Sequence, residues 1–338
     1  MAIGQGKSLV GLDIGSHTVQ GVEVVRRGEN LEMVNVGRSR IEGPGQTGEA
    51  VVQLFEQTGF RTRRVATAVS GRSVIVRYVS MMALSDEELR QAITYEADKY
   101  IPFDVSEVQL DCQRLDDVAD GQVKSDQMKV VLVAVKSTLV NEHVELLRSV
   151  GLVPDVIDVD AFALGNAFEL ASERVPLGES SVRALIDVGA SKTNINIVQD
   201  QTSYFTREIY IAGNDLTEAI AKRFGEEARD VERMKEDPGG ARDSLREAFI
   251  SSLEDLANEV QLSFDYYENQ FDHKVEEVFL SGGSVRFQGM DELLSQLLSL
   301  PTRIWDPTSG FGSGYAGGPL VNADLAIACG LAARLRGR

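Results

Sequence analysis

Ser8-Leu-Val-Gly-Leu-Asp-Ile-Gly15 is an apolar segment that ends on an aspartate and a glycine, and Arg183-Ala-Leu-Ile-Asp-Val-Gly189 repeats that order in the second half of the sequence. With Asp13 placed over Asp187, each copy continues into a short polar pair and then into a β-rich run. Each copy therefore predicts a buried strand, a tight turn and a second strand. Self-similarity at this separation predicts two related subdomains that face one another.

The residue types of these two turns fit a phosphate-binding cleft. An aspartate that ends a buried strand lies at the carboxyl edge of its sheet, where it can face a cleft. The glycine leaves no side chain in the way of a phosphate, and the hydroxyl and N–H groups of the turn can donate to phosphate oxygens. Two such carboxylates can hold a hydrated Mg²⁺ between nucleotide phosphates. One Asp-x-Gly turn means little, but two of them, with Ser281-Gly-Gly-Ser284 after a third apolar strand, predict a nucleotide-binding cleft.

The composition is that of an ordinary globular protein of 338 residues, 43% hydrophobic and 25% charged, and the length favours two domains. Lys and Arg total 34 against 52 Asp and Glu, which gives a net charge of −18. This acidic surplus argues against nucleic acid or an anionic lipid surface as the main partner, because both attract positive faces. It is compatible with a small anionic ligand held by backbone N–H groups.

Neither export nor a membrane span is expected from the sequence. The apolar run 130–135 is the longest and is far shorter than the ~20 residues of a transmembrane helix. Residues 1–7 lack the apolar region of a signal peptide. Cys112 and Cys329 form no C-x-x-C or zinc pattern, which fits two reduced thiols. We therefore expect a cytoplasmic protein.

The periodicity of the chain predicts an α/β protein. Strands are expected at 8–15, 18–25, 31–36, 65–69, 108–115, 129–135, 183–189, 192–198, 202–209 and 275–280. Helices are expected at 49–58, from 85 to about 100, before 150, and at 161–172, 216–224, 248–270, 290–298 and 323–335. Ser85-Asp-Glu-Glu88 is a capping box near the start of an α+β insert over 83–154. Gly43–Gly48 matches G-x-G-x-x-G but follows no buried strand, and we interpret it as a turn.

The two hairpins and the strand–Ser-Gly-Gly block resemble the actin-like ATPase superfamily, which includes DnaK-type chaperones, hexokinase and FtsA. The insert carries Glu96-Ala-Asp-Lys-Tyr-Ile-Pro-Phe103, and Val156-Ile-Asp-Val-Asp-Ala-Phe-Ala-Leu164 follows it. These motifs make the chain similar to the PilM family, the FtsA-like cytoplasmic components of type IV pilus assembly. Further matching motifs lie at 204–207, 213–217, 263–267 and 326–332, and the resemblance covers about residues 8–336.

The resemblance implies an actin-like ATPase fold, with two duplicated RNase-H-like domains and an FtsA-like inserted α+β subdomain. Residues 1–82, 155–182 and 323–338 would form the first subdomain, and 83–154 the insert. Residues 183–215 with 265–322 would form the second actin-like subdomain, and 216–264 a helical subdomain.

The resemblance also implies a site for ATP and Mg²⁺, with Asp13 and Asp187 at the metal and no assigned catalytic residue. The first phosphate turn would be Asp13, Gly15, Ser16, His17 and Thr18. The second would be Asp187, Gly189, Ala190, Ser191, Lys192 and Thr193. Gly213 and Asn214 would lie near the sugar and phosphates. Gly282, Gly283 and Ser284 would pack against the adenosine.

One position departs from the family, which commonly has a lysine where this sequence has Gln20. A neutral amide removes a cation near the phosphates, which weakens the case for strong ATP binding or turnover. Lys192, after the second turn, is a candidate to compensate for the missing charge.

The partner implied by the resemblance is PilN, a bitopic inner-membrane protein. Its N-terminal cytoplasmic tail would bind as an extended segment in a groove between the first subdomain and the insert. The chain would lie at the cytoplasmic face of the inner membrane, with membrane contact only through PilN, and would meet other pilus inner-membrane and motor components. A nucleotide-binding scaffold with at most slow ATPase activity is the leading hypothesis. A small-molecule kinase and a self-associating, filament-forming ATPase of the same superfamily are the alternatives.

Overall fold

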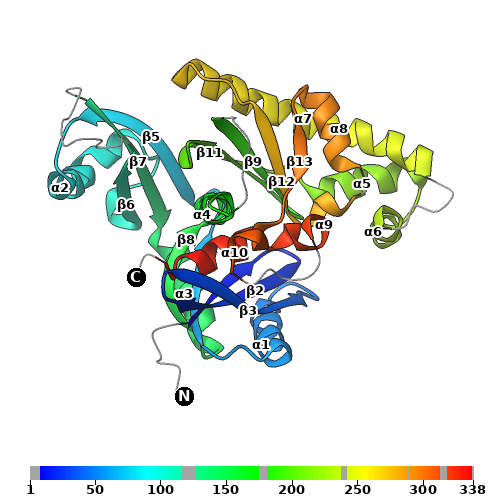
Figure 1. Cartoon of the computed structure of the whole chain (residues 1–338), viewed down its shortest axis with the longest axis horizontal. Helices are drawn as coiled ribbons and strands as arrows, with labels where there is room; N and C mark the ends of the chain where they lie inside the picture. The colour runs from blue at the N-terminus through cyan, green and yellow to red at the C-terminus, as the bar shows by residue number, and fades with distance from the viewer. Residues whose placement is uncertain are drawn as a thin grey trace. The chain divides into compact units, whose positions relative to one another are not determined.

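The structure is a computed structural model that describes residues 8–115, 127–174, 181–236, 242–287, 289–312 and 318–336. The chain divides into two units (Figure 1), a first unit of residues 1–68 with 150–338 and a second unit of residues 69–149. The proposed cleft residues all belong to the first unit, so the two units are described separately.

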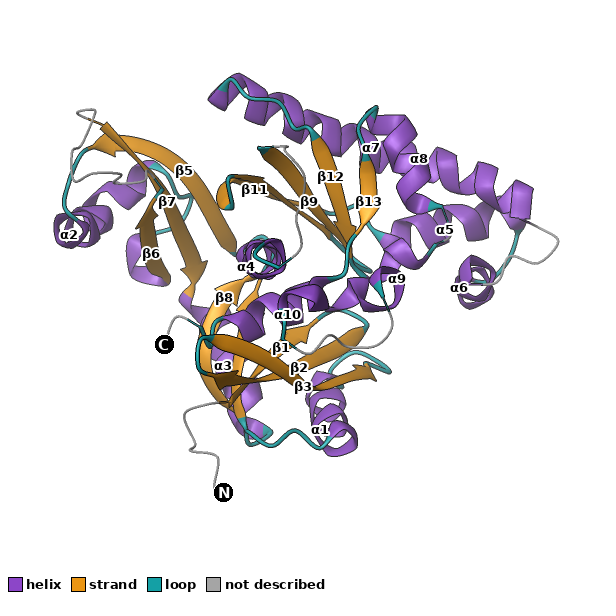
Figure 2. Ribbon diagram, viewed as in Figure 1, coloured by secondary structure: helices purple, strands orange, loops and turns teal. Residues whose placement is uncertain are grey.

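Two five-stranded sheets form the first unit, and they repeat one topology (Figure 2). The first sheet has the order β3-β2-β1-β4-β8, with β1 (Ser8–Ile14), β2 (Thr18–Arg27), β3 (Asn30–Arg40), β4 (Arg64–Val69) and β8 (Val153–Val159). The second sheet has the order β11-β10-β9-β12-β13, with β9 (Val182–Val188), β10 (Thr193–Gln199), β11 (Thr202–Ile209), β12 (Glu277–Ser281) and β13 (Thr302–Ile304). In both, the first strand pairs antiparallel with the next and parallel with the strand after the hairpin. The duplication expected from the two Asp-x-Gly segments is confirmed.

Two apolar helices, α4 (Asp160–Ser172) and α10 (Ala326–Ala333), lie between the sheets (Figure 1). Small residues let them approach closely, since a Cβ on Gly330 would lie 1.6 Å from the Ala163 carbonyl oxygen. A Cβ on Gly11 of β1 would likewise lie 2.0 Å from the Ala328 oxygen. These contacts hold α10 against both α4 and the first sheet.

The other long helices of the first unit pack against one sheet or the other. Helix α1 (Thr47–Thr58) packs on β2 and β3. The second sheet shares a large apolar core with α5 (Gly213–Phe224), α7 (Arg242–Phe271) and α8 (Met290–Leu298). Two shorter helices are α6 (Ala228–Glu236) and α9 (Pro319–Asn322). Of the helices in the described ranges, none is both long and apolar enough to cross a bilayer.

The second unit is a three-stranded sheet, β5-β7-β6, with β5 (Val74–Met82), β6 (Val108–Arg114) and β7 (Gln127–Lys136). Helix α2 (Asp86–Glu96) starts at the predicted capping box, in which Ser85 and Glu88 bond each other's backbone N–H groups. Its apolar side packs into the clusters that contain Val130 and Leu132. Helix α3 (Ser137–Ser149) follows β7.

Three strands were not expected from the sequence. β5 is half-exposed along most of its length and lacks a clear alternation, and because it pairs with β7 the second unit begins before residue 83. β8 contains Pro154, which is tolerated because β8 is an edge strand. β13 has only three residues. Residues 116–126, between β6 and β7, lie outside the described residues, and so do Gly314 and Gly317.

Candidate functional site

The two Asp-x-Gly turns have the same backbone geometry. Gly15 N donates to Thr18 O at 3.0 Å, and Gly189 N donates to Lys192 O at 3.0 Å. At either glycine a Cβ would lie 3.0 Å from that same carbonyl oxygen. Both turns therefore favour glycine for the same steric reason. In both, the aspartate is the last residue but one of the preceding strand.

The structure brings the two aspartates into one electrostatic cluster. Burial raises the pKa of Asp13 well above its usual value, and the negative charges of Asp160, Asp187 and Asp324 raise it further. Burial also raises the pKa of Asp187 to about 6, against a hydrogen bond from Ser281 that lowers it. Both carboxylates are thus harder to ionise than in water, and a cation placed beside them would restore their charged forms.

Lys192 lies in this cluster but is already paired. Its Nζ is 2.6 Å from Asp160 Oδ2 and 3.6 Å from Glu208 Oε2. Burial alone lowers the pKa of Lys192, but the carboxylates outweigh it and the pKa is raised. Asp160 begins α4, so the ammonium group is held in place by that helix. Asp160 lies within the Val156–Leu164 motif but was not predicted to be a site residue.

The residues expected near the sugar and adenosine gather around the second turn. Gly213 N and Ser284 Oγ both donate to Gly189 O, at 3.0 and 2.7 Å, and Asn214 N donates to Ala190 O at 2.8 Å. Gly282 has φ +98°, and a Cβ there would lie 2.4 Å from the Val188 oxygen. The glycine is required by both the conformation and the close approach.

Not every expected ligand side chain is available. Thr193 is fully buried and its Oγ1 donates to Ile211 O at 2.7 Å, so that its hydroxyl stabilises the hairpin. Ser16, His17 and Thr18 of the first turn are exposed, and Ser16 Oγ lies 3.1 Å from His17 Nδ1. The first turn therefore offers polar groups to solvent, whereas much of the second turn is engaged within the protein.

Gln20 has a partner that the sequence did not indicate. Its Nε2 donates to Asp324 Oδ2 at 3.0 Å, and the same carboxylate accepts bonds from Arg38 and Arg286. The amide that replaces the family's lysine is thus directed to a buried ion network. Across the described ranges, no three acidic, histidine or cysteine side chains converge as metal ligands.

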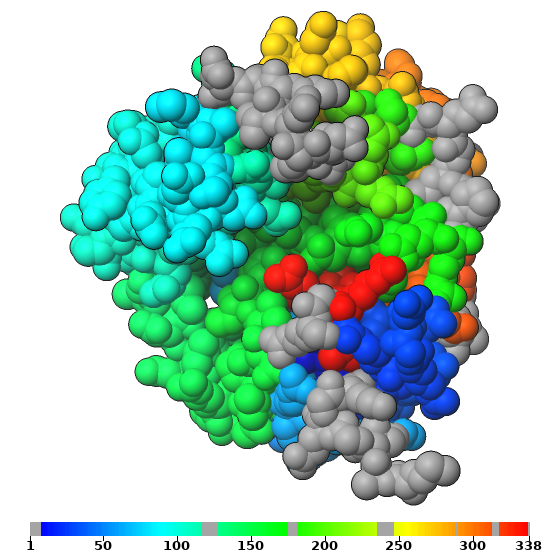
Figure 3. Space-filling view, turned by 60° about the vertical axis from the view of Figure 1, so that its left-hand side comes forward, coloured from blue at the N-terminus to red at the C-terminus, as the bar shows by residue number. Residues whose placement is uncertain are grey.

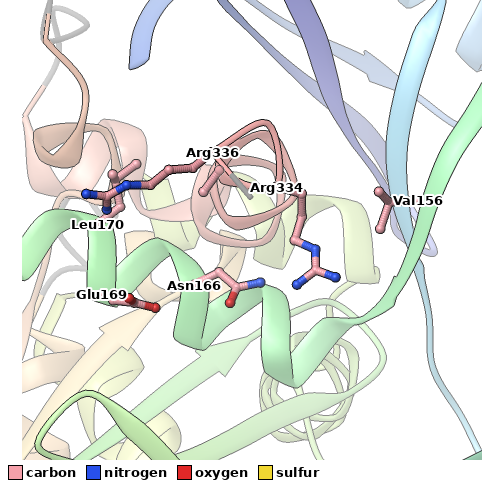
Figure 4. A pocket seen from close by; sticks show the side chains of 7 residues that line it. Val156, Asn166, Glu169, Leu170, Arg334 and Arg336 are labelled. Atoms are coloured by element: carbon pink, nitrogen blue, oxygen red, sulfur yellow. The ribbon is translucent and has the colours of Figure 1, made fainter. Parts of the chain in front are cut away.

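A pocket of about 550 Å³ lies elsewhere in the first unit, between β8, α4 and the end of α10 (Figure 4). Its lining residues are Val156, Asn166, Glu169, Leu170, Ala333, Arg334 and Arg336. Three of them, Asn166, Glu169 and Leu170, are on α4. At 1.5 Å per residue they lie about 9–15 Å along the helix axis from Asp160. The C-terminal part of the chain, in red, reaches the molecular surface (Figure 3).

Salt bridges hold both arginines at the pocket. Arg334 Nε is 3.4 Å from Asp158 Oδ2, and Arg336 Nη1 is 2.6 Å from Glu173 Oε1. The side chains of Arg334 and Asn166 extend into the space between α10 and α4 (Figure 4). The pocket therefore combines apolar walls with fixed charged groups.

The family profile of type IV pilus assembly protein PilM matches residues 11–336, almost the whole chain. The chain belongs to the PilM family. A PilM-PilN type IV pilus biogenesis complex contains a chain similar to this one, with 26% identity and a TM-score of 0.83 over 97% of this chain and 98% of that chain. This match confirms the expected actin-like ATPase fold and the membership of a pilus assembly family.

Two further proteins are more distantly similar to the chain. Cell division protein FtsA of Staphylococcus epidermidis is 22% identical over 200 residues, which are 52% of this PilM-family chain and 42% of FtsA. The match thus spans less than half of the length of FtsA. MreB5 of Spiroplasma citri, solved with ADP bound, is 11% identical with a TM-score of 0.50 over 96% of this chain and 94% of that chain.

Proposed function

We propose that this chain is a nucleotide-binding scaffold of type IV pilus assembly that binds the N-terminal cytoplasmic tail of a PilN protein. The observation that carries the proposal is the similarity to a chain of a PilM-PilN complex over 97% of this sequence. The scaffold would lie at the cytoplasmic face of the inner membrane, attached through PilN. Because the family is a pilus assembly family, neither a small-molecule kinase nor a filament-forming ATPase is favoured.

The nucleotide would bind between the two Asp-x-Gly turns. Asp13, Gly15, Ser16, His17 and Thr18 would form one wall. Asp187, Gly189, Ala190, Ser191, Lys192 and Thr193 would form the other, with Gly213, Asn214, Gly282, Gly283 and Ser284 beside the sugar and base. The raised pKa values of Asp13 and Asp187 support a bound cation. Mg²⁺ with ATP suits such a pair, because Mg²⁺ is bound by one or two carboxylates together with waters and phosphates.

In this proposal the chain's own groups position the phosphates. The turn N–H groups would donate to phosphate oxygens. The Lys192 ammonium pairs with Asp160 and belongs to the same charged cluster as Asp187. The bound ion would neutralise phosphate charge. No residue is assigned to activate a water, so we expect binding with at most slow hydrolysis.

The pocket between β8, α4 and α10 is the best candidate for part of the tail site. Val156, Leu170 and Ala333 offer apolar contacts, and Arg334 and Arg336 supply charged donors at fixed positions. An extended tail can bury apolar side chains in such a pocket and bond its backbone to the neighbouring polar groups.

The test is isothermal titration calorimetry with a synthetic PilN N-terminal peptide and, separately, with Mg·ATP. We expect micromolar or tighter peptide binding, and Ala333→Phe should weaken it at least tenfold by filling the pocket. Gln57→Phe, on the exposed face of α1, is the matched control and should bind as wild type does. Absence of peptide binding to the wild type would refute the scaffold proposal.

A further inference from the structure

Asp324 carries a hydrogen-bonded ion network that joins distant parts of the first unit. Its carboxylate accepts from Gln20 Nε2 at 3.0 Å, from Arg38 Nε and Nη2 at 2.8 and 2.7 Å, and from Arg286 Nη2 at 2.8 Å. The Asp324 residue is only 8% exposed. A buried carboxylate with charged donors on both oxygens makes strong, directional bonds.

The donors come from both sheets of the duplicated unit. Gln20 and Arg38 lie on β2 and β3 of the first sheet. Arg286 ends η5 (Gly283–Arg286), the 3₁₀ turn that follows β12 of the second sheet. The backbone adds a bond at the same point, since Gly282 N donates to the oxygen of Ala323, the residue before Asp324, at 2.9 Å. One carboxylate therefore connects the first sheet to the Ser-Gly-Gly turn of the second.

The network also borders the proposed cleft. The negative charge of Asp324 contributes to the raised pKa of both Asp13 and Asp187. Because Arg38 comes from the first sheet and Arg286 from the turn after β12 of the second, moving the sheets apart would break at least one charged bond to the shared carboxylate. It would also leave a buried charge partly unpaired, which is costly.

We propose that Asp324 is a positioning residue that clasps the two sheets of the first unit across the proposed nucleotide cleft. It sets how far the cleft opens and, through that, how tightly the cleft holds a nucleotide. The effect on nucleotide affinity rests on the proposed function, whereas the effect on the separation of the sheets does not.

The chain contains a matched control. Glu277 of β12 also holds two arginines, Arg183 at 2.9 Å and Arg303 at 3.1 Å. Its side chain is 12% exposed, against 5% for Asp324. All three of these residues lie on strands of the second sheet. Glu277→Gln therefore weakens a comparable network without touching the connection between the sheets.

The experiment measures the distance between spin labels on Gln57→Cys of α1 and Gln261→Cys of α7, by double electron–electron resonance in the full chain. Both positions are exposed. Cys112 is changed to Ser, and the buried Cys329 is kept. The distance distribution is compared among the labelled parent, Asp324→Asn, Arg286→Gln and Glu277→Gln, and Mg·ATP affinity is measured on unlabelled versions of the same set.

We expect Asp324→Asn and Arg286→Gln to broaden the distribution or shift it to longer distances. Both should also weaken Mg·ATP binding roughly five- to 150-fold, the usual range of coupling between sites. Glu277→Gln should change neither. Asp324→Glu should restore part of the affinity that Asp324→Asn loses. If Asp324→Asn does not fold, Arg286→Gln decides, because it removes only the donor from the second sheet.

An unchanged distribution in Arg286→Gln would overturn the clasp, and so would an equal broadening in Glu277→Gln. If the distribution responds but the parent protein binds no nucleotide, the clasp stands and the proposed nucleotide site fails. If the distance distribution changes but the parent and all variants bind Mg·ATP equally well, the claim that the clasp sets nucleotide affinity is wrong.

Discussion

The first and second Asp-x-Gly turns share one backbone design but differ in their surroundings. Gly189 O accepts two bonds, from Gly213 N and Ser284 Oγ, and Asn214 N donates to Ala190 O. In the first turn Ser16, His17 and Thr18 are exposed, and His17 O accepts from Ile41 N at 2.8 Å. A turn whose geometry is fixed before the ligand arrives loses less entropy on binding. We therefore expect the second turn to contribute most of the nucleotide affinity and the first turn to be ordered by the nucleotide.

The largest expected effect is a difference in Mg·ATP affinity between the two aspartate variants. Asp187→Asn should weaken Mg·ATP binding about 100-fold and Asp13→Asn about tenfold, where each factor of ten corresponds to about 1.4 kcal/mol. The reason is that Asp187 lies in the turn that is already held by its neighbours. Titration calorimetry of the two variants measures the ratio, and equal losses would show that the turns contribute equally.

The stability of the ligand-free protein should depend on pH through Asp187. Its pKa is raised from 3.8 to about 6 in the folded protein, so the folded state binds this proton more tightly than the unfolded state does. The free energy of unfolding therefore falls as the pH rises from about 4 through 6. Asp187→Asn removes that loss and should be more stable than wild type by about 3 kcal/mol at pH 7.5.

Urea unfolding between pH 4 and 8 tests this expectation. The advantage of Asp187→Asn should shrink as the pH approaches 4, where the wild-type carboxyl is protonated in the folded state and about half protonated in the unfolded state. A constant difference across the range would show that the effect arises from packing rather than from titration.

The Asp160→Asn variant tests the role of Lys192 in the second turn, because it removes the ion pair between Lys192 and Asp160. Loss of the 2.6 Å ion pair removes a negative charge and frees the Lys192 ammonium for phosphate, so Mg·ATP binding should tighten about fivefold, or about 1 kcal/mol. Lys192→Met should weaken it by a similar factor. Weaker binding in Asp160→Asn would mean that Asp160 is needed to position the lysine.

Gln20→Lys should have the smallest effect. The new ammonium would lie beside Asp324, which already accepts bonds from Arg38 and Arg286, and much of its charge would be compensated there. We expect nucleotide affinity to rise only about threefold, or about 0.7 kcal/mol. An increase of more than about 30-fold would show that the missing lysine is the main reason for weak binding in the first turn.

Local features of the fold were predictable from the sequence. The strand–Asp–Gly turns and the Ser85 capping box depend on residues that are neighbours in the chain, and each element formed where the pattern placed it. β5 and β8 were missed because a half-exposed strand and an edge strand with a proline lack the alternation that identifies strands.

The long-range parts of the site were not predictable. Gln20, Arg38 and Arg286 lie 304, 286 and 38 positions from Asp324, and only the folded duplication brings them together. Asp160 is nearer in sequence to Lys192, at 32 positions, but the strand β9 lies between α4 and β10 in the chain. The two side chains therefore meet only once the sheet has formed. The residues around Asp160 in the sequence do not indicate which side chain its carboxylate pairs with.

A crystal structure of the chain with Mg²⁺ and a non-hydrolysable ATP analogue tests the central claim most directly. We expect phosphate oxygens bonded to N–H groups of both the Gly15–Thr18 and the Gly189–Thr193 turns, with the metal ion near Asp13 and Asp187. A nucleotide bound against one turn only, or in the pocket between α4 and α10, would contradict it.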